Sequence, residues 1–216
     1  MSTDTRTKIL DAAESLFADR GFAATSLRDI TSVAGVNLAA VNYHFGSKDE
    51  LLAAALERRI APVNHLRLQL LDQAEAAAGG EPIEVELLLR ALLAPPFRQA
   101  DLDDAQRTRF LQLVGRLCAV PHDRVRAIVT SQFQEVTRRF VPAFQRALPH
   151  LDADDVGCRI FFVIGTMFHT MTWYGMIQTF GGRAPRDSEE MLDLLVRFSE
   201  AGMRAPAPVR VAGVGR

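Results

Sequence analysis

The sequence has little of the features that mark several large classes of protein. Its two cysteines, Cys118 and Cys158, form no CxxC pair, which excludes a disulfide scaffold and a zinc ribbon. It contains no GxSxG, HExxH, GxGxxG or phosphate-loop motif, and its five histidines lack a metal-binding spacing. We therefore expect a protein that is not an enzyme and has no catalytic residues, no metal and no cofactor.

An excess of charge of one sign is also absent. The 25 basic residues are balanced by 26 acidic ones, so the net charge of −1 does not by itself indicate a nucleic acid or a membrane as partner. Hydrophobic residues make up 48% of the 216 residues, which is typical of a folded globular chain. The N-terminal segment is too polar for a secretory signal, and with so few cysteines this favours a cytoplasmic protein.

One segment, residues 160–182, lacks charged side chains and is long enough to cross a bilayer. It carries His169, Gln178 and four threonines, and these polar groups are costly in a single helix that faces lipid. We therefore expect no membrane span. A soluble helix that is apolar nearly all round must instead be buried on several sides.

Apolar residues recur at helical spacing and strand-like alternation is almost absent, which predicts an all-α fold. Short helices are expected at residues 7–20, 26–35 and 38–44. Ser26 and Asn37 are the capping residues of the second and third of these helices. The second helix should bury Leu27, Ile30 and Val33.

Longer helices follow, separated by proline and glycine. They are expected at about residues 47–61, 82–93, 101–120, 123–148, 152–180 and 187–203. Pro62 should bend or end the first of these helices, Pro95 and Pro96 should end the second, and Pro142 should interrupt the fourth.

The second and third short helices, joined by a tight turn at Gly35, form a predicted helix-turn-helix. In such a motif the second helix can enter the major groove of DNA. An ordinary three-helix core without DNA binding has the same spacing. Residues 1–60 hold seven basic and eight acidic groups, so their charge does not decide between these alternatives.

The residues themselves carry a family resemblance. The stretch from Ile9 to Leu52, with FADRGFAATSLRDITSVAGV followed by NLAAVNYHFGSKDELL, resembles the N-terminal DNA-binding domain of the TetR family of one-component repressors. The resemblance implies an N-terminal three-helix helix-turn-helix domain plus a larger C-terminal helical bundle. The implied boundaries are a DNA-binding domain at 1–47, a ligand-binding and dimerisation domain at 48–204 and a disordered tail at 205–216.

The resemblance also implies partners. A twofold homodimer would present two recognition helices to major-groove faces about 34–36 Å apart, so the double-stranded operator should be palindromic. The mechanism implied is release of the operator when a small hydrophobic effector binds.

Residues 38–44 are then the recognition helix. Ala39 and Ala40 are small enough for close approach to the bases, and their methyl groups suit contact with thymine. Arg28 is the candidate guanine contact, with a phosphate contact or a surface ion pair as the alternative, and Asn42 could bind adenine or a phosphate. The complete set of expected DNA contacts is Ser26, Arg28, Asn37, Leu38, Ala39, Ala40, Asn42, Tyr43, His44 and Lys48.

The resemblance places the last two long helices in a four-helix dimer interface. Gly165 and Gly175 would allow the helices to approach closely. The expected interface residues are Phe161, Gly165, Phe168, Thr172, Gly175, Leu192, Leu195, Val196 and Phe198. Packing within one chain is the alternative for each of them.

Between these regions the sequence is rich in leucine, phenylalanine and valine, which suits a pocket for an apolar ligand. Arg116 shares a helix face with apolar residues and could meet a carboxylate. The expected ligand-binding residues are Phe110, Leu113, Val114, Arg116, Leu117, Phe133, Phe140, Phe144, Phe162, Phe168 and Trp173. Each could equally be ordinary core.

The string GVNLAAVNYHFGSKDELL, followed by LERRIAPVN, is more similar to the PsrA-like branch of the family, whose members respond to fatty acids or acyl-CoA, than to the drug-sensing branches. We therefore interpret the chain as a ligand-responsive repressor with a fatty acid or acyl-CoA as effector. A regulator that responds to drugs or aromatic compounds and a helical interaction protein that binds no DNA are the alternatives.

Overall fold

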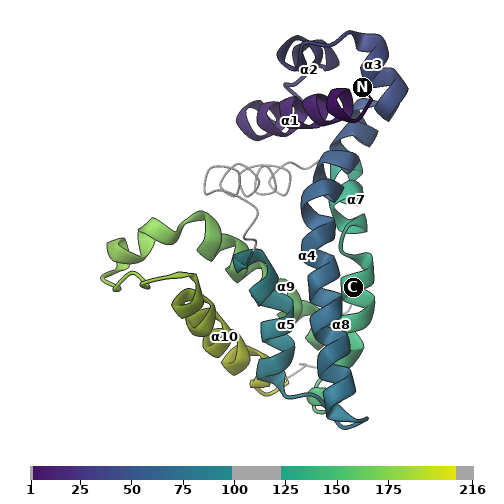
Figure 1. Ribbon diagram of the computed structural model, residues 1–216. Helices are drawn as coiled ribbons and strands as arrows, with labels where there is room; N and C mark the ends of the chain where they lie inside the picture. The colour runs from purple at the N-terminus through teal and green to yellow at the C-terminus, as the bar shows by residue number, and fades with distance from the viewer. Residues whose placement is uncertain (1, 99–122, 208–216) are drawn as a thin grey trace, which may run out of the picture. The chain divides into compact units, whose positions relative to one another are not determined.

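The computed structural model describes residues 2–98 and 123–207 (Figure 1). All regular structure within these residues is helical, which confirms the predicted all-α fold. The α-helices are α1 (Ser2–Arg20), α2 (Leu27–Ala34), α3 (Leu38–Phe45), α4 (Lys48–Ala78), α5 (Val85–Phe97), α7 (Asp123–Ser131), α8 (Gln134–Ala147), α9 (Ala153–Thr172) and α10 (Ser188–Arg204), and the 3-10 helix η1 spans Tyr174–Phe180. The helix expected at residues 101–120 lies outside the described residues.

The chain divides into two compact units. The described residues of unit 1 are 2–66, 98, 123–135 and 171–174, and those of unit 2 are 67–97, 136–170 and 175–207. Unit 1 thus continues along α4 beyond residue 47. The boundaries at 47 and 204 stay predictions.

The helices α1, α2 and α3 form a three-helix module around one apolar core. Ile9 and Phe17 of α1, Ile30 of α2 and Val41 of α3 are each fully buried, and Phe45 is 7% exposed. Complete burial of one such side chain contributes about 1.5–3 kcal/mol. Leucines from the first turns of α4 join this burial in unit 1, namely Leu51, Leu52 and Leu56.

The expected burial of Val33 is wrong. Its side chain is 62% exposed, whereas Thr31 is buried and donates its hydroxyl to the carbonyl oxygen of Arg28 at 2.9 Å. The helix α2 is only two turns long and packs against both α1 and α3. Its neighbours, and not its periodicity alone, therefore decide which sides are covered.

The helix α4 continues through Pro62, so it does not end there; the alternative expectation, a bend at Pro62, stays a prediction. Proline removes one hydrogen bond from a helix, but residues beyond it are anchored by burial. Val63, Asn64 and Leu71 are all buried. This packing offsets the local cost and keeps 31 residues in one helix.

The long helix predicted at 123–148 is broken, but not at Pro142. It is divided into α7 and α8 at Gln132 and Phe133, and Pro142 lies inside α8. The side-chain amide of Asn64 donates to the carbonyl oxygen of Gln132 at 2.6 Å. A tertiary contact from α4 therefore satisfies a carbonyl at the break.

Two other helix ends also differ from the prediction. The helix α5 includes Pro95 and Pro96 instead of ending before them. The helix α9 ends at Thr172, and the segment to Phe180 is the 3-10 helix η1. Gly175 is a weak helix former, and 3-10 geometry is frequent at the ends of α-helices.

In unit 2, α5 packs alongside α10, and α8 lies beside the second half of α4 (Figure 1). Arg90 of α5 binds Asp193 of α10 at 2.7 Å. Arg139 of α8 binds Asp72 and Glu75 of α4 at 2.6 and 2.8 Å. These ion pairs lie at the edges of the apolar contacts that hold the helices together.

The beginning of the tail is anchored. The guanidinium of Arg159 donates to the carbonyl oxygens of Gly202, Met203, Ala205 and Pro206 at 2.7–2.9 Å. It thereby caps the C-terminal end of α10, where carbonyls lack helical partners. The carbonyls of residues 205 and 206 are thus hydrogen-bonded to α9, residues 208–216 lie outside the described part, and the disorder expected for the tail stays a prediction.

Among the described residues, no helix has the length and apolarity that a membrane span requires. The uncharged segment at 160–182 is divided between α9 and η1. It therefore does not form one continuous α-helix.

Arg67 of α4 is a buried cation inside unit 2. Only 4% of its surface is exposed, and burial lowers its pKa to about 10. Its Nε donates to the carbonyl oxygen of Leu92 at 2.8 Å, and one terminal nitrogen lies 3.9 Å from the sulfur of Met167. The side chain therefore links α4, α5 and α9.

We expect Arg67→Ala to lower the free energy of unfolding by about 2–4 kcal/mol, because it leaves a cavity and an unsatisfied carbonyl. Arg67→Met keeps most of the volume without the charge and should cost less. Urea unfolding of both variants measures the difference. An equal loss in both would show that the guanidinium, and not the filled volume, provides the stability.

Candidate DNA-binding site

The turn between α2 and α3 has the local geometry of a helix-turn-helix. Gly35 ends α2 with φ of 65°, in the left-handed region that glycine adopts without strain. At the other end of α2, Ser26 and Asp29 form a capping box. Hydrogen bonds from the hydroxyl and the backbone N–H of Ser26 lower the pKa of Asp29. Both ends of this short helix are therefore fixed.

The helix α3 has one buried side and one exposed side. Val41 and Phe45 face the core, and Tyr43 on the opposite side is 84% exposed. The other exposed residues of this segment are Asn37, Leu38, Ala39 and Asn42, whereas Ala40 and His44 are half-buried. The predicted recognition residues thus lie on the surface, and the small side chain of Ala39 leaves the helix backbone open to close approach.

Two of the expected contact residues are engaged in caps. The side-chain oxygen of Asn37 accepts from the backbone N–H of Ala40 at 2.8 Å, which leaves its amide nitrogen to donate to a phosphate. The hydroxyl of Ser26 donates to Asp29 at 2.6 Å. Arg28, in the first turn of α2 and two residues after the cap Ser26, is exposed and forms no ion pair with any other described residue.

Lys48 lies where α4 begins. Its ammonium donates to the carbonyl oxygen of Thr25 at 2.7 Å and lies 4.3 Å from the ring centroid of Phe22. Burial lowers the pKa of Lys48, an effect partly opposed by the nearby carboxylate of Asp49. The ammonium thus joins α4 to the chain before α2 and still has N–H groups to offer a phosphate.

Several contacts of unit 1 have no signal in the sequence. Arg6 lies over the ring of Phe45 at 5.3 Å, and the buried hydroxyl of Thr25 donates to the backbone of α1. Arg124 of α7 binds Asp49 of α4 at 2.9 Å. These partners are far apart in sequence, so spacing rules for a single helix could not find them.

The expected dimer residues separate into two groups. Phe161, Gly165, Thr172 and Phe198 are exposed and Phe168 is half-buried, whereas the burial of Gly175 is not described. Leu192, Leu195 and Val196 are at most 4% exposed within their own chain. Their burial agrees with the alternative of packing within one chain, because α10 packs against α5 in unit 2, and their place in a dimer interface stays a prediction.

The expected ligand residues are likewise divided. Phe110, Leu113, Val114, Arg116 and Leu117 lie outside the described residues. Phe140 and Phe144 are buried in unit 2, with ring centroids 6.4 Å apart, and Phe133 and Phe168 are half-buried. Phe162 and Trp173 are 62% and 55% exposed, which makes them surface residues of the single chain.

Family models match both parts of the chain. The model described as "Bacterial regulatory proteins, tetR family" matches residues 9–55, which include the three-helix module. The model "Tetracyclin repressor-like, C-terminal domain" matches residues 90–202. The chain belongs to the TetR family.

Individual relatives agree with this assignment. The transcriptional repressor Rv3405c of Mycobacterium tuberculosis is 40% identical over 129 residues, covering 53% of this chain and 65% of that protein. The transcriptional regulator FadR from Bacillus subtilis, solved with stearoyl-CoA, superposes with a TM-score of 0.62 at 15% identity over 91% of this chain and 98% of that one. The ketosteroid regulator KstR2 of Mycobacterium tuberculosis gives 0.59 at 20% identity over 91% and 93%.

These structural similarities, at 15–20% identity, establish the fold of the TetR regulators alone. The predicted TetR resemblance is confirmed by the family models. The PsrA-like branch and the effector stay predictions.

We expect Arg28→Ala to weaken binding to the preferred operator by about 1–3 kcal/mol and to relax specificity at one base pair. Lys48→Ala should weaken all sequences alike and reduce the slope of log affinity against log salt by about one. Titrations at several salt concentrations measure both effects.

Lys48→Arg is the control for Lys48→Ala. It keeps the positive charge but changes the contacts to Thr25 and Phe22, so it separates the effect of the charge from that of these contacts. The division of roles is wrong if Arg28→Ala and Lys48→Ala lose equal affinity and both retain full sequence preference.

Proposed function

We propose that this protein is a ligand-responsive transcriptional repressor that binds a palindromic operator as a homodimer in the cytoplasm. A small hydrophobic effector, a fatty acid or an acyl-CoA, releases it from DNA. The observation that carries the proposal is the exposed side of α3, which presents small and polar side chains on a module matched by the TetR family model.

The surface of the module supports DNA binding despite its balanced charge. Arg28, Lys48 and the N-terminal end of α4 can meet phosphates, while α3 approaches the bases. Local placement of cations, and not net charge, determines such contacts. Two modules on one operator double the number of phosphate contacts.

Exposed apolar residues on α9 and α10 support the homodimer. Phe161 and Phe162 of α9 are 72% and 62% exposed, and Leu194 and Phe198 of α10 are 51% and 70% exposed. Exposed apolar groups of this size are typical of an interaction surface. A second copy of the chain offers the same exposed apolar residues, so a twofold interface can bury both sets.

The apolar effector is supported by composition and by relatives. The described core of unit 2 contains Phe140, Phe144 and Met167 around the middle of its helices. One relative was solved with stearoyl-CoA and another is a ketosteroid regulator, and the stearoyl chain and the ketosteroid skeleton are both apolar. A hydrophobic pocket suits them better than a small polar metabolite.

Release requires that the effector bind more tightly to a conformation that fits the operator poorly. The helix α4 contributes residues to both units, which makes it the element through which the two sites can be coupled. In unit 1, α7 is tied to α4 by Arg124 and by the hydrogen bond of Asn64 to Gln132. A shift of α7 would therefore pull on α4.

Selection of bound DNA from a random pool tests the DNA-binding proposal. The wild-type chain should enrich a palindrome whose half-sites are about 10 base pairs apart, or a multiple of that distance. Ala39→Glu places a negative charge at an exposed position of α3 and should abolish enrichment without unfolding the protein. Enrichment of no sequence by the wild type would favour the interaction protein that binds no DNA.

Thermal unfolding with a series of fatty acids and acyl-CoAs tests the effector. A ligand at about 100 times its Kd should stabilise the native state by about 2.7 kcal/mol. The same ligand should then release the selected operator. Stabilisation by planar aromatic compounds and by no acyl chain would support the alternative, a regulator that responds to drugs or aromatic compounds.

A further inference from the structure

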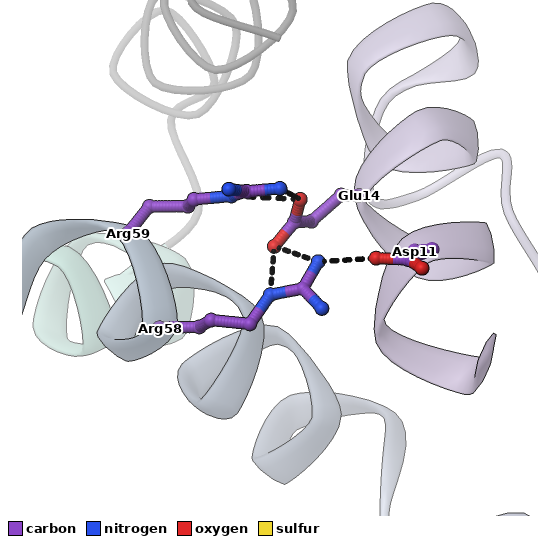
Figure 2. A network of polar contacts seen from close by, with 4 residues as sticks. All are labelled: Asp11, Glu14, Arg58 and Arg59. Atoms are coloured by element: carbon purple, nitrogen blue, oxygen red, sulfur yellow. Dashed lines mark hydrogen bonds and ion pairs between the residues drawn. The ribbon is translucent and has the colours of Figure 1, made fainter. Parts of the chain in front are cut away.

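A partly buried cluster of ion pairs joins α1 to α4 within unit 1 (Figure 2). The carboxylate of Glu14 lies between two guanidinium groups, Arg58 on one side and Arg59 on the other. We call these three residues the Glu14 clamp. Arg58 reaches further and binds Asp11, one turn before Glu14 on α1, at 2.8 Å.

Each carboxylate oxygen of Glu14 has its own arginine. Oε1 accepts from Nε of Arg58 at 2.8 Å and pairs with its terminal nitrogen at 2.6 Å. Oε2 accepts from Nε and a terminal nitrogen of Arg59 at 3.1 and 2.8 Å. Each arginine thus directs two N–H groups at one oxygen of the same carboxylate, so Glu14 is held from both sides.

The Glu14 clamp is shielded more than an ordinary surface ion pair. The side chain of Glu14 is 15% exposed, and those of Arg58 and Arg59 are 24% and 20% exposed. By contrast, the pair of Lys8 with Asp4 has side chains 55% and 69% exposed. Salt screens shielded pairs less, so the clamp persists at ionic strengths that weaken exposed pairs.

The remaining contacts between α1 and its neighbours are mostly apolar. Apolar burial is non-directional and allows small rotations of one helix on another at low cost. A carboxylate that accepts charge-assisted hydrogen bonds from two arginines does not allow such rotations without breaking or lengthening these bonds. The clamp is therefore the part of unit 1 best suited to fix the angle between α1 and α4.

We propose that Glu14 is a positioning residue for operator binding, which sets the orientation of the three-helix module on α4. This inference rests on the proposed function as a dimeric operator-binding protein. In a dimer the angle of each module on α4 determines where α3 points. Glu14 therefore controls which half-site spacing the dimer accepts, although it touches no base.

The first test measures the module without DNA. Spin labels at Ala39→Cys on α3 and His65→Cys on α4, with Cys118 and Cys158 replaced by serine, report the distance between the two helices. The wild-type background should give a narrow distance distribution. Glu14→Gln removes the charge that both arginines bind and should broaden this distance distribution.

The second test measures operator spacing with the palindrome selected by the wild-type chain. One additional base pair rotates a half-site by about 35°, so the wild type should bind the lengthened operator about tenfold more weakly. Glu14→Gln should reduce this discrimination severalfold while keeping the base preference within each half-site. The matched control is Glu57→Gln, which makes the same chemical change at an exposed residue next to Arg58.

The double variant Arg58→Lys with Arg59→Lys keeps both charges but removes the planar guanidinium groups, each of which directs two N–H groups at Glu14. It should give an intermediate loss of the discrimination between operator spacings. It replaces Glu14→Gln if that variant fails to fold. An unchanged distance distribution, or a broadened one with wild-type spacing discrimination, overturns the proposal. If the wild type selects no DNA, the proposed function fails, and the spin-label distances still decide whether the clamp fixes the module.

Discussion

The arrangement of the three-helix module depends on burial of one side of each short helix. Ile30 of α2 and Val41 of α3 reach the same core as Phe17 of α1. Because α3 must turn Val41 and Phe45 inward, Ala39 and Tyr43 are forced outward. The outward side of α3 is thus a consequence of apolar burial. Ser26 and Gly35 fix the two ends of α2, and Asn37 fixes the start of α3.

Directional polar contacts add what apolar burial cannot provide. Lys48 binds the carbonyl of Thr25 and so fixes the start of α4 against the chain before α2. Glu14 binds Arg58 and Arg59, which lie about three turns further along α4 than Lys48. Apolar contacts supply most of the stability of unit 1, whereas these charged contacts specify its angles.

Unit 2 uses its apolar residues in two ways. Leu192 and Val196 of α10 are completely buried against their own chain, while Phe198 on another side of the same helix is 70% exposed. An α-helix that carries apolar residues on two sides has more apolar surface than one core can cover. This excess is the physical argument for the proposed homodimer.

The sequence by itself determined the helical class, the caps at Ser26 and Asn37, the turn at Gly35 and the family, because these features depend on neighbours within a few residues. Tertiary structure alone decided that α4 passes Pro62, that the break before α8 lies at Gln132 and that Leu192 belongs to the core. It also decided the partners of Glu14, which are more than forty residues away in the sequence. Such contacts depend on which helix faces come together in space, and the periodicity of one helix does not contain that information.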